Sequence, residues 1–179
     1  MNICIIGSTG HYGYVLEGMR GQPDVNLAAV APGSPGEDAA KLIRAAEENG
    51  FRPQAFERYE EMLDAVKPDV VAVACHFTDH GKIALEALKR GIHAFVEKPV
   101  ANTLEELEAV EAAYRQSGTH LAAMFGLRCT PWFLTAKRLI REGAVGEIRL
   151  MHAQKSYKLG TRSQVFRKRD TYCGTIPWV

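Results

Sequence analysis

The chain has 179 residues, 46% hydrophobic and 24% charged, enough to bury the core of one ordinary domain or of one domain and part of a second. Its 22 Lys and Arg nearly balance 21 Asp and Glu, which removes the electrostatic case for a nucleic-acid or anionic-membrane partner. The apolar runs are too short to span a bilayer, and no export signal is evident. Four scattered cysteines without a C-x-x-C pair indicate a reducing compartment, so we expect a cytoplasmic protein.

Short apolar runs alternate with helical patterns through the first 125 residues. The runs typical of strands are 3–6, 25–30, 70–75, 92–96 and 121–125, with a weaker one at 51–56. The helical patterns between them are 12–20, 37–49, 59–66, 79–89 and 103–116. This alternation is typical of βαβ units, and near-continuous apolar strands indicate a sheet covered on both faces. We therefore predict an α/β fold with a doubly wound parallel sheet.

The pattern changes after the last of these strands. Residues 131–141 favour another helix, and residues 148–156 favour a new strand. We place a domain boundary at residue 126, so that residues 1–126 form one domain and residues 127–179 begin a second, incomplete one.

Two features of the second segment have structural interpretations. The apolar side chains of Trp132, Phe133, Leu134 and Leu139 are spaced as the core of an interdomain helix. The basic run at residues 162–169 is expected to be a solvated loop, because the whole chain is nearly neutral. Neither feature predicts a nucleic-acid site.

A glycine-rich turn follows the first strand and leads into a helix. In this position such a turn presents backbone amides and a helix N-terminus to a pyrophosphate. Its spacing is G-x-x-G-x-x-G, which differs from the commoner G-x-G-x-x-G, and a tight turn without a ligand is the alternative. We favour a dinucleotide site, with contacts from Gly7, Thr9, Gly10, His11 and Tyr12.

The residues after the second strand leave the cofactor preference open. An acid that holds the ribose of NAD, or an Arg that receives the 2′-phosphate of NADP, normally lies there. Residues 31–34 read Ala-Pro-Gly-Ser and contain neither. Glu37 and Asp38, in the next helical pattern, are the nearest carboxylates. We therefore expect NAD or NADP without choosing between them.

The segment after the fourth strand contains His76, Phe77 and His80. It falls at the carboxyl edge of the predicted sheet, where doubly wound folds bind ligands, so we expect these residues to border the nicotinamide. The two histidines are also spaced as an i, i+4 metal pair. No third ligand accompanies them, and we predict no metal site.

The fifth strand runs into Glu97, Lys98 and Pro99 at that same edge. A lysine in this crevice fits a role in hydrogen-bonding a substrate hydroxyl or exchanging a proton with it. A surface lysine in a loop is the alternative. Lys98 is our candidate catalytic residue.

Together these motifs resemble those of the Gfo/Idh/MocA family, named after glucose–fructose oxidoreductase and inositol 2-dehydrogenase. The resemblance rests on the glycine turn, the His pair at 76 and 80, and residues 91–99, Gly-Ile-His-Ala-Phe-Val-Glu-Lys-Pro. It continues in Arg128-Cys-Thr-Pro131, similar to an R-x-x-P motif, and in the glycine turn at 141–148. The match spans nearly the whole chain.

The resemblance implies a Rossmann domain that binds NAD or NADP, followed by the start of an α/β (α+β) substrate domain. It implies an oxidoreductase acting on a secondary alcohol or ketone of a sugar, inositol or related polyol. Lys98 would position the substrate, Glu97 and Pro99 would hold the lysine, and Arg128 would lie near the cofactor. It places a further catalytic Asp and His beyond Val179, so we expect this chain to bind nucleotide without normal turnover, and the complete protein to form homo-oligomers.

Two other classes of protein share part of this pattern. A short-chain dehydrogenase needs Tyr-x-x-x-Lys, and none of the six tyrosines has a lysine four positions later. A non-catalytic sensor or assembly protein that binds nucleotide on the same fold stays open, because a fold does not determine a function.

Overall fold

The structure is a computed structural model that describes residues 1–154 and 156. In this part of the chain one parallel sheet has the strand order β3-β2-β1-β4-β5-β6. Its strands are β1 (Asn2–Ile6), β2 (Asn26–Ala31), β3 (Gln54–Ala55), β4 (Val70–Val73), β5 (His93–Val96) and β6 (Leu121–Ala123). The α-helices are α1 (Tyr12–Met19), α2 (Ala39–Glu48), α3 (Tyr59–Val66), α4 (His80–Lys89), α5 (Leu104–Ser117) and α6 (Pro131–Arg141). The described residues also contain two 3-10 helices, η1 (Phe77–Asp79) and η2 (Gly126–Cys129). The strand order and the alternation of strands with helices confirm the predicted doubly wound α/β fold.

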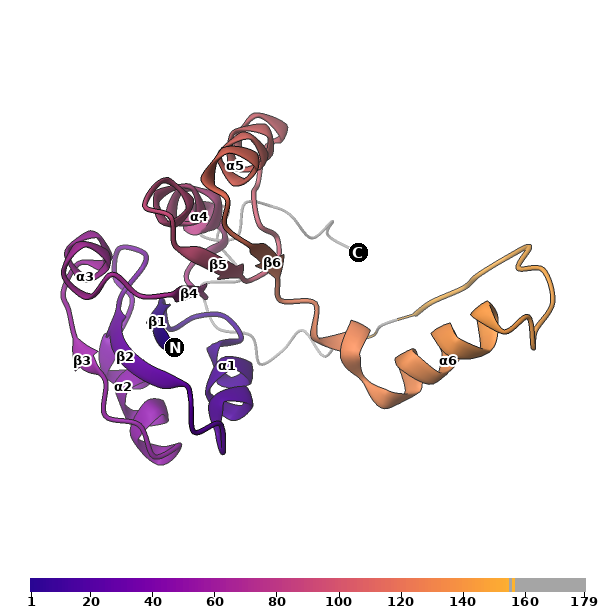
Figure 1. Ribbon diagram of the computed structural model, residues 1–179, viewed down its shortest axis with the longest axis horizontal. Helices are drawn as coiled ribbons and strands as arrows, with labels where there is room; N and C mark the ends of the chain where they lie inside the picture. The colour runs from indigo at the N-terminus through magenta and orange to yellow at the C-terminus, as the bar shows by residue number, and fades with distance from the viewer. Residues whose placement is uncertain (155, 157–179) are drawn as a thin grey trace.

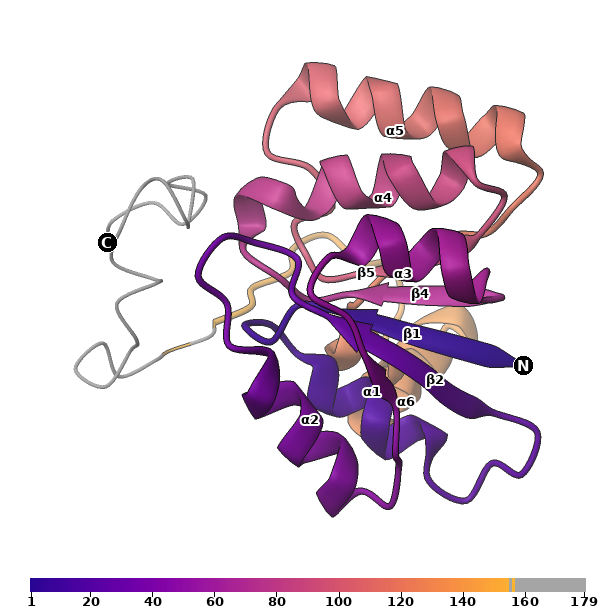
Figure 2. The same cartoon turned by 90° about the vertical axis from the view of Figure 1, so that its left-hand side faces the viewer.

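Helices cover both faces of the sheet, α1 and α2 on one face and α3, α4 and α5 on the other (Figures 1 and 2). Successive side chains of β1 alternate between the two apolar clusters. Cys4 and Ile6 pack in the cluster with α3 and α4, whereas Ile3 and Ile5 pack in the one with α1 and α2. This burial on both sides explains why the strands have near-continuous apolar sequences.

The strand order fixes where a ligand can bind. From β1 the chain winds outward through β2 to β3, and it then returns to β4 on the other side of β1. The turn after β1 and the loop after β4 therefore meet at the carboxyl edge of the sheet. In doubly wound folds this reversal point is where ligands bind.

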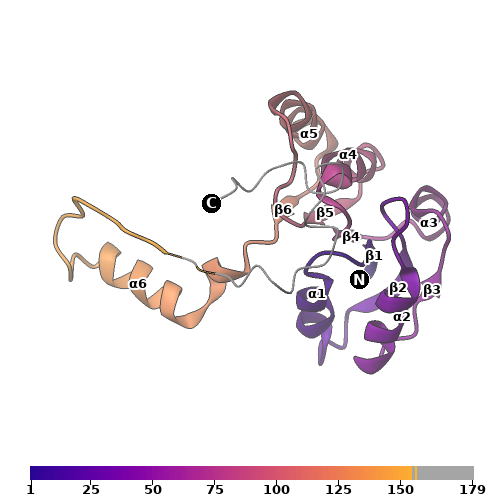
Figure 3. The ribbon, with the colours of Figure 1, turned by 180° about the vertical axis from the view of Figure 1, so that it is seen from behind.

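The second segment differs from the sequence-based expectation. Helix α6 forms as predicted but projects away from the sheet (Figures 1 and 3). Trp132 and Phe133 are 62% and 40% exposed, Leu134 is exposed too, and Leu139 is only half-buried. The prediction that these four residues are core is wrong in this structure, because no element of the described chain covers that helix.

The predicted strand at 148–156 is also wrong over its described residues, which contain no strand. A strand is stable only when it pairs with a neighbour, and within the described chain no partner strand lies beside this segment. The basic run at 162–169 lies outside the described residues. No helix among those described has the length and apolar character to cross a membrane. The domain boundary at 126 stays a prediction.

Candidate functional site

The glycine turn after β1 is pressed against the end of β4. Gly7 has a φ of +92°, and its amide donates to the carbonyl oxygen of Ala31 at 2.9 Å. A Cβ on Gly7 would lie 2.4 Å from the Cα of Cys75. A Cβ on Gly10 would lie 3.1 Å from Cγ of Glu97. Close packing at this sheet edge therefore leaves no room for a side chain at Gly7, and Gly10 is in tight contact with Glu97.

Most amides of this turn already have partners within the protein. The amides of Thr9 and Gly10 both donate to the carbonyl oxygen of Ala74, at 3.1 and 2.8 Å. The amide of Ser8 donates to Oε1 of Glu37 at 3.0 Å. These bonds hold the turn in place, and they leave the three amides without a proton to offer a pyrophosphate.

The first turn of α1 is different. The His11 amide donates to Oε2 of Glu97 at 2.9 Å. In the described part of the chain the next two amides, those of Tyr12 and Gly13, have no hydrogen-bond acceptor. Unpaired amides at a helix start are the usual donors to a phosphate. Sequence reasoning found Tyr12 but missed Gly13, whose signal was its place two residues into the helix.

Glu97 is fully buried beneath this helix start. Besides the His11 amide, its carboxylate contacts Nδ1 of the His11 ring, and it accepts the Lys98 amide at 2.9 Å. Burial opposes the charge on Glu97, but the bonds from His11 and the charge of Lys98 outweigh burial and hold the pKa of Glu97 below its usual range. The predicted Glu97 is therefore an ionised anchor between the turn after β1 and the loop after β5.

Lys98 is the part of this loop that can reach a ligand. Its side chain is 44% exposed, and its Nζ lies 3.4 Å from Oε1 of Glu97. The ammonium also lies 5.6 Å from the centre of the Phe77 ring, within the range of a cation–π interaction. The structure thus brings the predicted Phe77, Glu97 and Lys98 together, with the lysine at the surface.

Both histidines after β4 are buried, at 9% exposed for His76 and 0% for His80. His80 has no exposed surface, and its ring nitrogens lie 2.7 Å from the Pro99 carbonyl oxygen and 3.1 Å from that of Cys75. The His80 ring therefore links the loop after β4 to the loop after β5, and it has no surface through which to contact a cofactor. His76 is buried as well, and its amide donates to Oγ of Ser34 at 3.1 Å. Burial lowers the pKa of His80, which the two carbonyls oppose only in part.

Two further predicted contacts lie at the rim. The Nζ of Lys41 lies 5.9 Å from the centre of the Tyr12 ring, within the range of a cation–π interaction. Arg128 is exposed on η2. That turn approaches α1 at Gly126, where an added Cβ would lie 3.3 Å from the Tyr14 ring.

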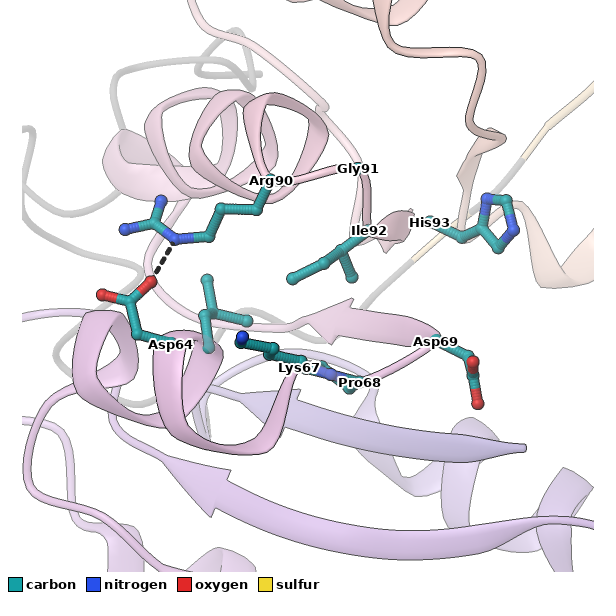
Figure 4. A pocket seen from close by; sticks show the side chains of 9 residues that line it. Asp64, Lys67, Pro68, Asp69, Arg90, Gly91, Ile92 and His93 are labelled. Atoms are coloured by element: carbon teal, nitrogen blue, oxygen red, sulfur yellow. Dashed lines mark hydrogen bonds and ion pairs between the residues drawn. The ribbon is translucent and has the colours of Figure 1, made fainter.

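A pocket of about 600 Å³ lies at the edge formed by the amino ends of the strands, between the ends of α3 and α4 (Figure 4). Its arginine, Arg90, already donates to Asp64 at 2.8 Å. None of the predicted site residues lines it. In the described residues no three His, Cys, Asp or Glu side chains cluster as metal ligands. The candidate site is therefore the carboxyl edge, where the glycine turn and Lys98 meet.

A doubly wound sheet with a glycine turn and an open helix start at its reversal point defines a nucleotide-binding protein of the Rossmann class. The comparison with family models narrows this class. The model of the Gfo/Idh/MocA oxidoreductase family, described as an NAD-binding Rossmann fold, matches residues 1–125. The chain belongs to this family.

Individual relatives agree with that assignment. Glycosyl hydrolase family 109 protein 2 of Akkermansia muciniphila is 32% identical over 99 residues, 55% of this chain and 20% of that protein. The scyllo-inositol 2-dehydrogenase (NAD(+)) of Bacillus subtilis is 28% identical over 142 residues, 79% of this chain and 40% of that protein. The chain thus spans less than half the length of these two relatives.

Solved structures show the same fold. One from Thermotoga maritima is 50% identical with a TM-score of 0.90, and the match covers 100% of this chain and 55% of that one. A levoglucosan dehydrogenase in complex with NADH and levoglucosan is 28% identical with a TM-score of 0.66, covering 82% of this chain and 40% of that one. The predicted Rossmann fold is confirmed.

Proposed function

We propose that this chain is the cofactor-binding part of an NAD(P)-dependent oxidoreductase that acts on a secondary alcohol or ketone of a sugar, inositol or related polyol. The observation that carries the proposal is the joint placement of two features at one sheet edge. The open amides of Tyr12 and Gly13 lie on the helix start that contacts Glu97, and Glu97 also holds the surface ammonium of Lys98. The candidate phosphate-binding amides and the candidate catalytic lysine are thus both positioned by the buried carboxylate of Glu97.

Each group has a role in such a reaction. The amides of Tyr12 and Gly13 bind the pyrophosphate, and Lys98 hydrogen-bonds the substrate hydroxyl and assists removal of its proton. When bound, the nicotinamide would supply the acceptor for the hydride that leaves the carbon of that alcohol. Glu97 keeps Lys98 in place and Pro99 shapes the loop through its bond to His80.

Relatives support the substrate class. Among them are an inositol dehydrogenase and a levoglucosan dehydrogenase whose structure contains NADH. The cofactor belongs to the nicotinamide dinucleotides, NAD or NADP. The free thiols of Cys4, Cys75 and Cys129 support a reducing compartment such as the cytoplasm.

A titration with NADH and NADPH, followed by nicotinamide fluorescence, tests the first half of the proposal. We expect saturable binding of one or both by the folded chain. Lys98→Ala should leave that affinity within about twofold, because the lysine faces the substrate. Lys89→Ala, an exposed lysine on α4, is the matched control. Absence of binding by folded protein would refute the proposal.

Turnover tests the second half. Oxidation of a panel of inositols and sugars, followed as NADH or NADPH formation, should occur in the complete protein and be lost in its Lys98→Ala variant. Unchanged turnover in that variant would remove Lys98 from the mechanism. Dinucleotide binding with no turnover of any polyol would instead favour the alternative, a non-catalytic sensor or assembly protein on the same fold.

A further inference from the structure

The imidazole ring of His11 is anchored at one nitrogen and open at the other. Its Nδ1 contacts Oε2 of Glu97, a side chain with no exposed surface, whereas 49% of the His11 side chain is exposed. Within the described residues the second ring nitrogen, Nε2, has no hydrogen-bond partner. The proposed reaction uses the helix start that follows His11 but gives this ring no role.

The buried carboxylate determines which ring nitrogen carries the proton. Burial opposes the charge on Glu97, but the bonds from His11 and the charge of Lys98 outweigh it and hold the pKa of Glu97 below its usual range. An ionised carboxylate only accepts hydrogen bonds, so Nδ1 of His11 must carry a proton to donate to it. In the neutral ring the lone pair is therefore on the open nitrogen, Nε2. A carboxylate that fixes the tautomer of a histidine in this way prepares the imidazole to act as a general base.

Two further contacts hold the ring in one orientation. The ring of His11 stacks on that of Tyr14, with 5.1 Å between the centroids and 9° between the planes. The amide of His11 donates to the same Oε2 of Glu97 at 2.9 Å, which fixes the backbone from which the ring projects. The ring is therefore held at the carboxyl edge of the sheet in a defined orientation, which efficient proton transfer requires.

The other oxygen of this carboxylate holds Lys98. The ammonium of Lys98 lies 3.4 Å from Oε1 of Glu97. An ammonium has three protons and no lone pair, so it can donate a hydrogen bond to an alcohol oxygen but cannot take up the proton of that alcohol. Oxidation of an alcohol to a ketone releases one proton besides the hydride, so the reaction also needs a proton acceptor. His11 offers a lone pair on the same carboxylate that holds Lys98.

We propose that His11 is the proton acceptor of this reaction. Lys98 donates a hydrogen bond to the substrate oxygen. The alcohol carbon gives up its hydride to the nicotinamide, the O–H bond breaks, and its electron pair forms the second carbon–oxygen bond of the ketone. The released proton goes to the lone pair of Nε2, directly or through one water. The ring is then positively charged beside the ionised Glu97, and Nε2 passes the proton to solvent. This inference rests on the proposed function and assigns its base.

The tautomer of His11 tests the first half of the inference without any turnover. In the chain labelled with ¹⁵N-histidine, two-bond ¹H–¹⁵N NMR spectra at pH 8.5 should show the neutral His11 ring protonated on Nδ1. The His11→Asn variant identifies its signals. His93 is an internal control with the opposite tautomer, because its Nδ1 accepts the His120 amide at 2.9 Å. A His11 ring protonated on Nε2 would overturn the inference.

Turnover of inositols and sugars by the complete protein tests the second half. His11→Asn keeps a donor near the place of Nδ1 but lacks the basic Nε2, so kcat should fall by about hundredfold or more. Its NADH affinity should stay within about twofold. Free imidazole should restore part of the rate of His11→Ala in proportion to its concentration, because it supplies the missing lone pair. His93→Asn, at the amino ends of the strands, is the matched control and should keep full activity.

Three results would overturn the inference and leave the proposed function standing, provided that Lys98→Ala is inactive. One is an unchanged kcat in a folded His11→Asn variant, which would mean that another part of the complete protein supplies the base. Another is a loss of rate in His11→Ala that imidazole does not relieve. The third is a loss of NADH affinity in His11→Asn large enough to account for the loss of rate. Absence of any polyol turnover in the wild type would refute the proposed function and this inference together.

Discussion

The buried carboxylate of Glu97 contacts the ring Nδ1 of His11, although the two residues are separated by 86 positions in the chain. The same carboxylate accepts the amides of His11 and Lys98, each at 2.9 Å. One side chain thus ties the start of α1 to the loop after β5. The nucleotide turn and the candidate catalytic lysine are therefore one structural unit.

Glu97→Gln should lower the free energy of unfolding by about 1–3 kcal/mol, because a buried acceptor of several hydrogen bonds becomes an amide with one oxygen. The pKa of Glu97 is held low in the folded protein, so its charged form stabilises the fold above the unfolded-state pKa of about 4.3. That contribution is lost as the pH falls through the folded-state pKa. Urea denaturation of both proteins from pH 7 to pH 3 should show the difference shrinking at the acid end.

A difference between the two proteins that stays constant across this pH range would contradict the ionised state of Glu97. Glu105→Gln, at an exposed carboxylate in the first turn of α5, is the control and should change stability by less than about 0.5 kcal/mol.

Gly7→Ala should destabilise the protein by about 3 kcal/mol, because the residue has a positive φ and its Cβ would meet the backbone of Cys75 at 2.4 Å. Gly13→Ala, in a helix with nothing within 4 Å of the added Cβ, should instead stabilise by about 0.5–1 kcal/mol. Thermal denaturation of the two variants measures both changes. Equal effects of the two substitutions would show that close packing at Gly7 is unimportant.

His80→Gln should give a stability loss that depends on pH in a defined direction. Burial lowers the pKa of His80 in the folded protein, so the unfolded chain, with a pKa near 6.5, takes up the proton first as the pH falls. The stabilising contribution is complete above pH 6.5 and declines until the folded-state pKa is reached. Unfolding free energies from pH 7.5 to pH 5 should therefore converge for wild type and variant.

His93→Gln is the matched control for this experiment, since His93 is half-buried at the opposite edge of the sheet. Other charged groups near His80 are the carboxylates of Glu97 and Glu37, which favour its protonated form. Divergence of wild type and His80→Gln toward low pH would show that the folded protein binds the proton more tightly than the unfolded chain.

Thiol reactivity should separate the described cysteines by burial. Burial raises the pKa of Cys4 to about 11 and raises that of Cys75 further, whereas Cys129 is exposed. In a Cys173→Ser background at pH 8, iodoacetamide should modify Cys129 and leave Cys4 and Cys75 intact until urea unfolds the protein. Peptide mass spectrometry reads out each site. Early modification of Cys75 in native protein would contradict the packing of the glycine turn.

The positions of the strands could be predicted well from the sequence. Strands that are buried on both faces require continuous apolar runs, and such runs are easily recognised in a sequence. Lys98 was placed at the correct edge for the same reason. The prediction of a strand at residues 148–156 failed because a strand also needs a neighbouring strand to pair with. The sequence of one segment does not show whether such a neighbour is present. Trp132 was likewise assigned to a core that the described chain does not provide.

The fine structure of the site was harder to predict. His80 was expected beside the cofactor, yet both of its ring nitrogens contact backbone carbonyl oxygens. The positions of backbone carbonyls cannot be recognised from a sequence motif. The amides of Thr9 and Gly10 are satisfied by Ala74, far away in the chain. Glu37 gave a partial signal, as an acid soon after β2, but its four donors became visible only once the two loops were brought together.

The internal bonds of the glycine turn have a consequence for how a ligand arrives. Ala74, Glu37 and Glu97 hold the turn through hydrogen bonds within the protein, so the helix start that carries the two open amides of α1 is positioned by the fold itself. Binding to such a preformed seat loses little conformational entropy and requires no slow rearrangement of the loop. Association of a dinucleotide should therefore proceed in one fast kinetic phase, with its rate proportional to ligand concentration.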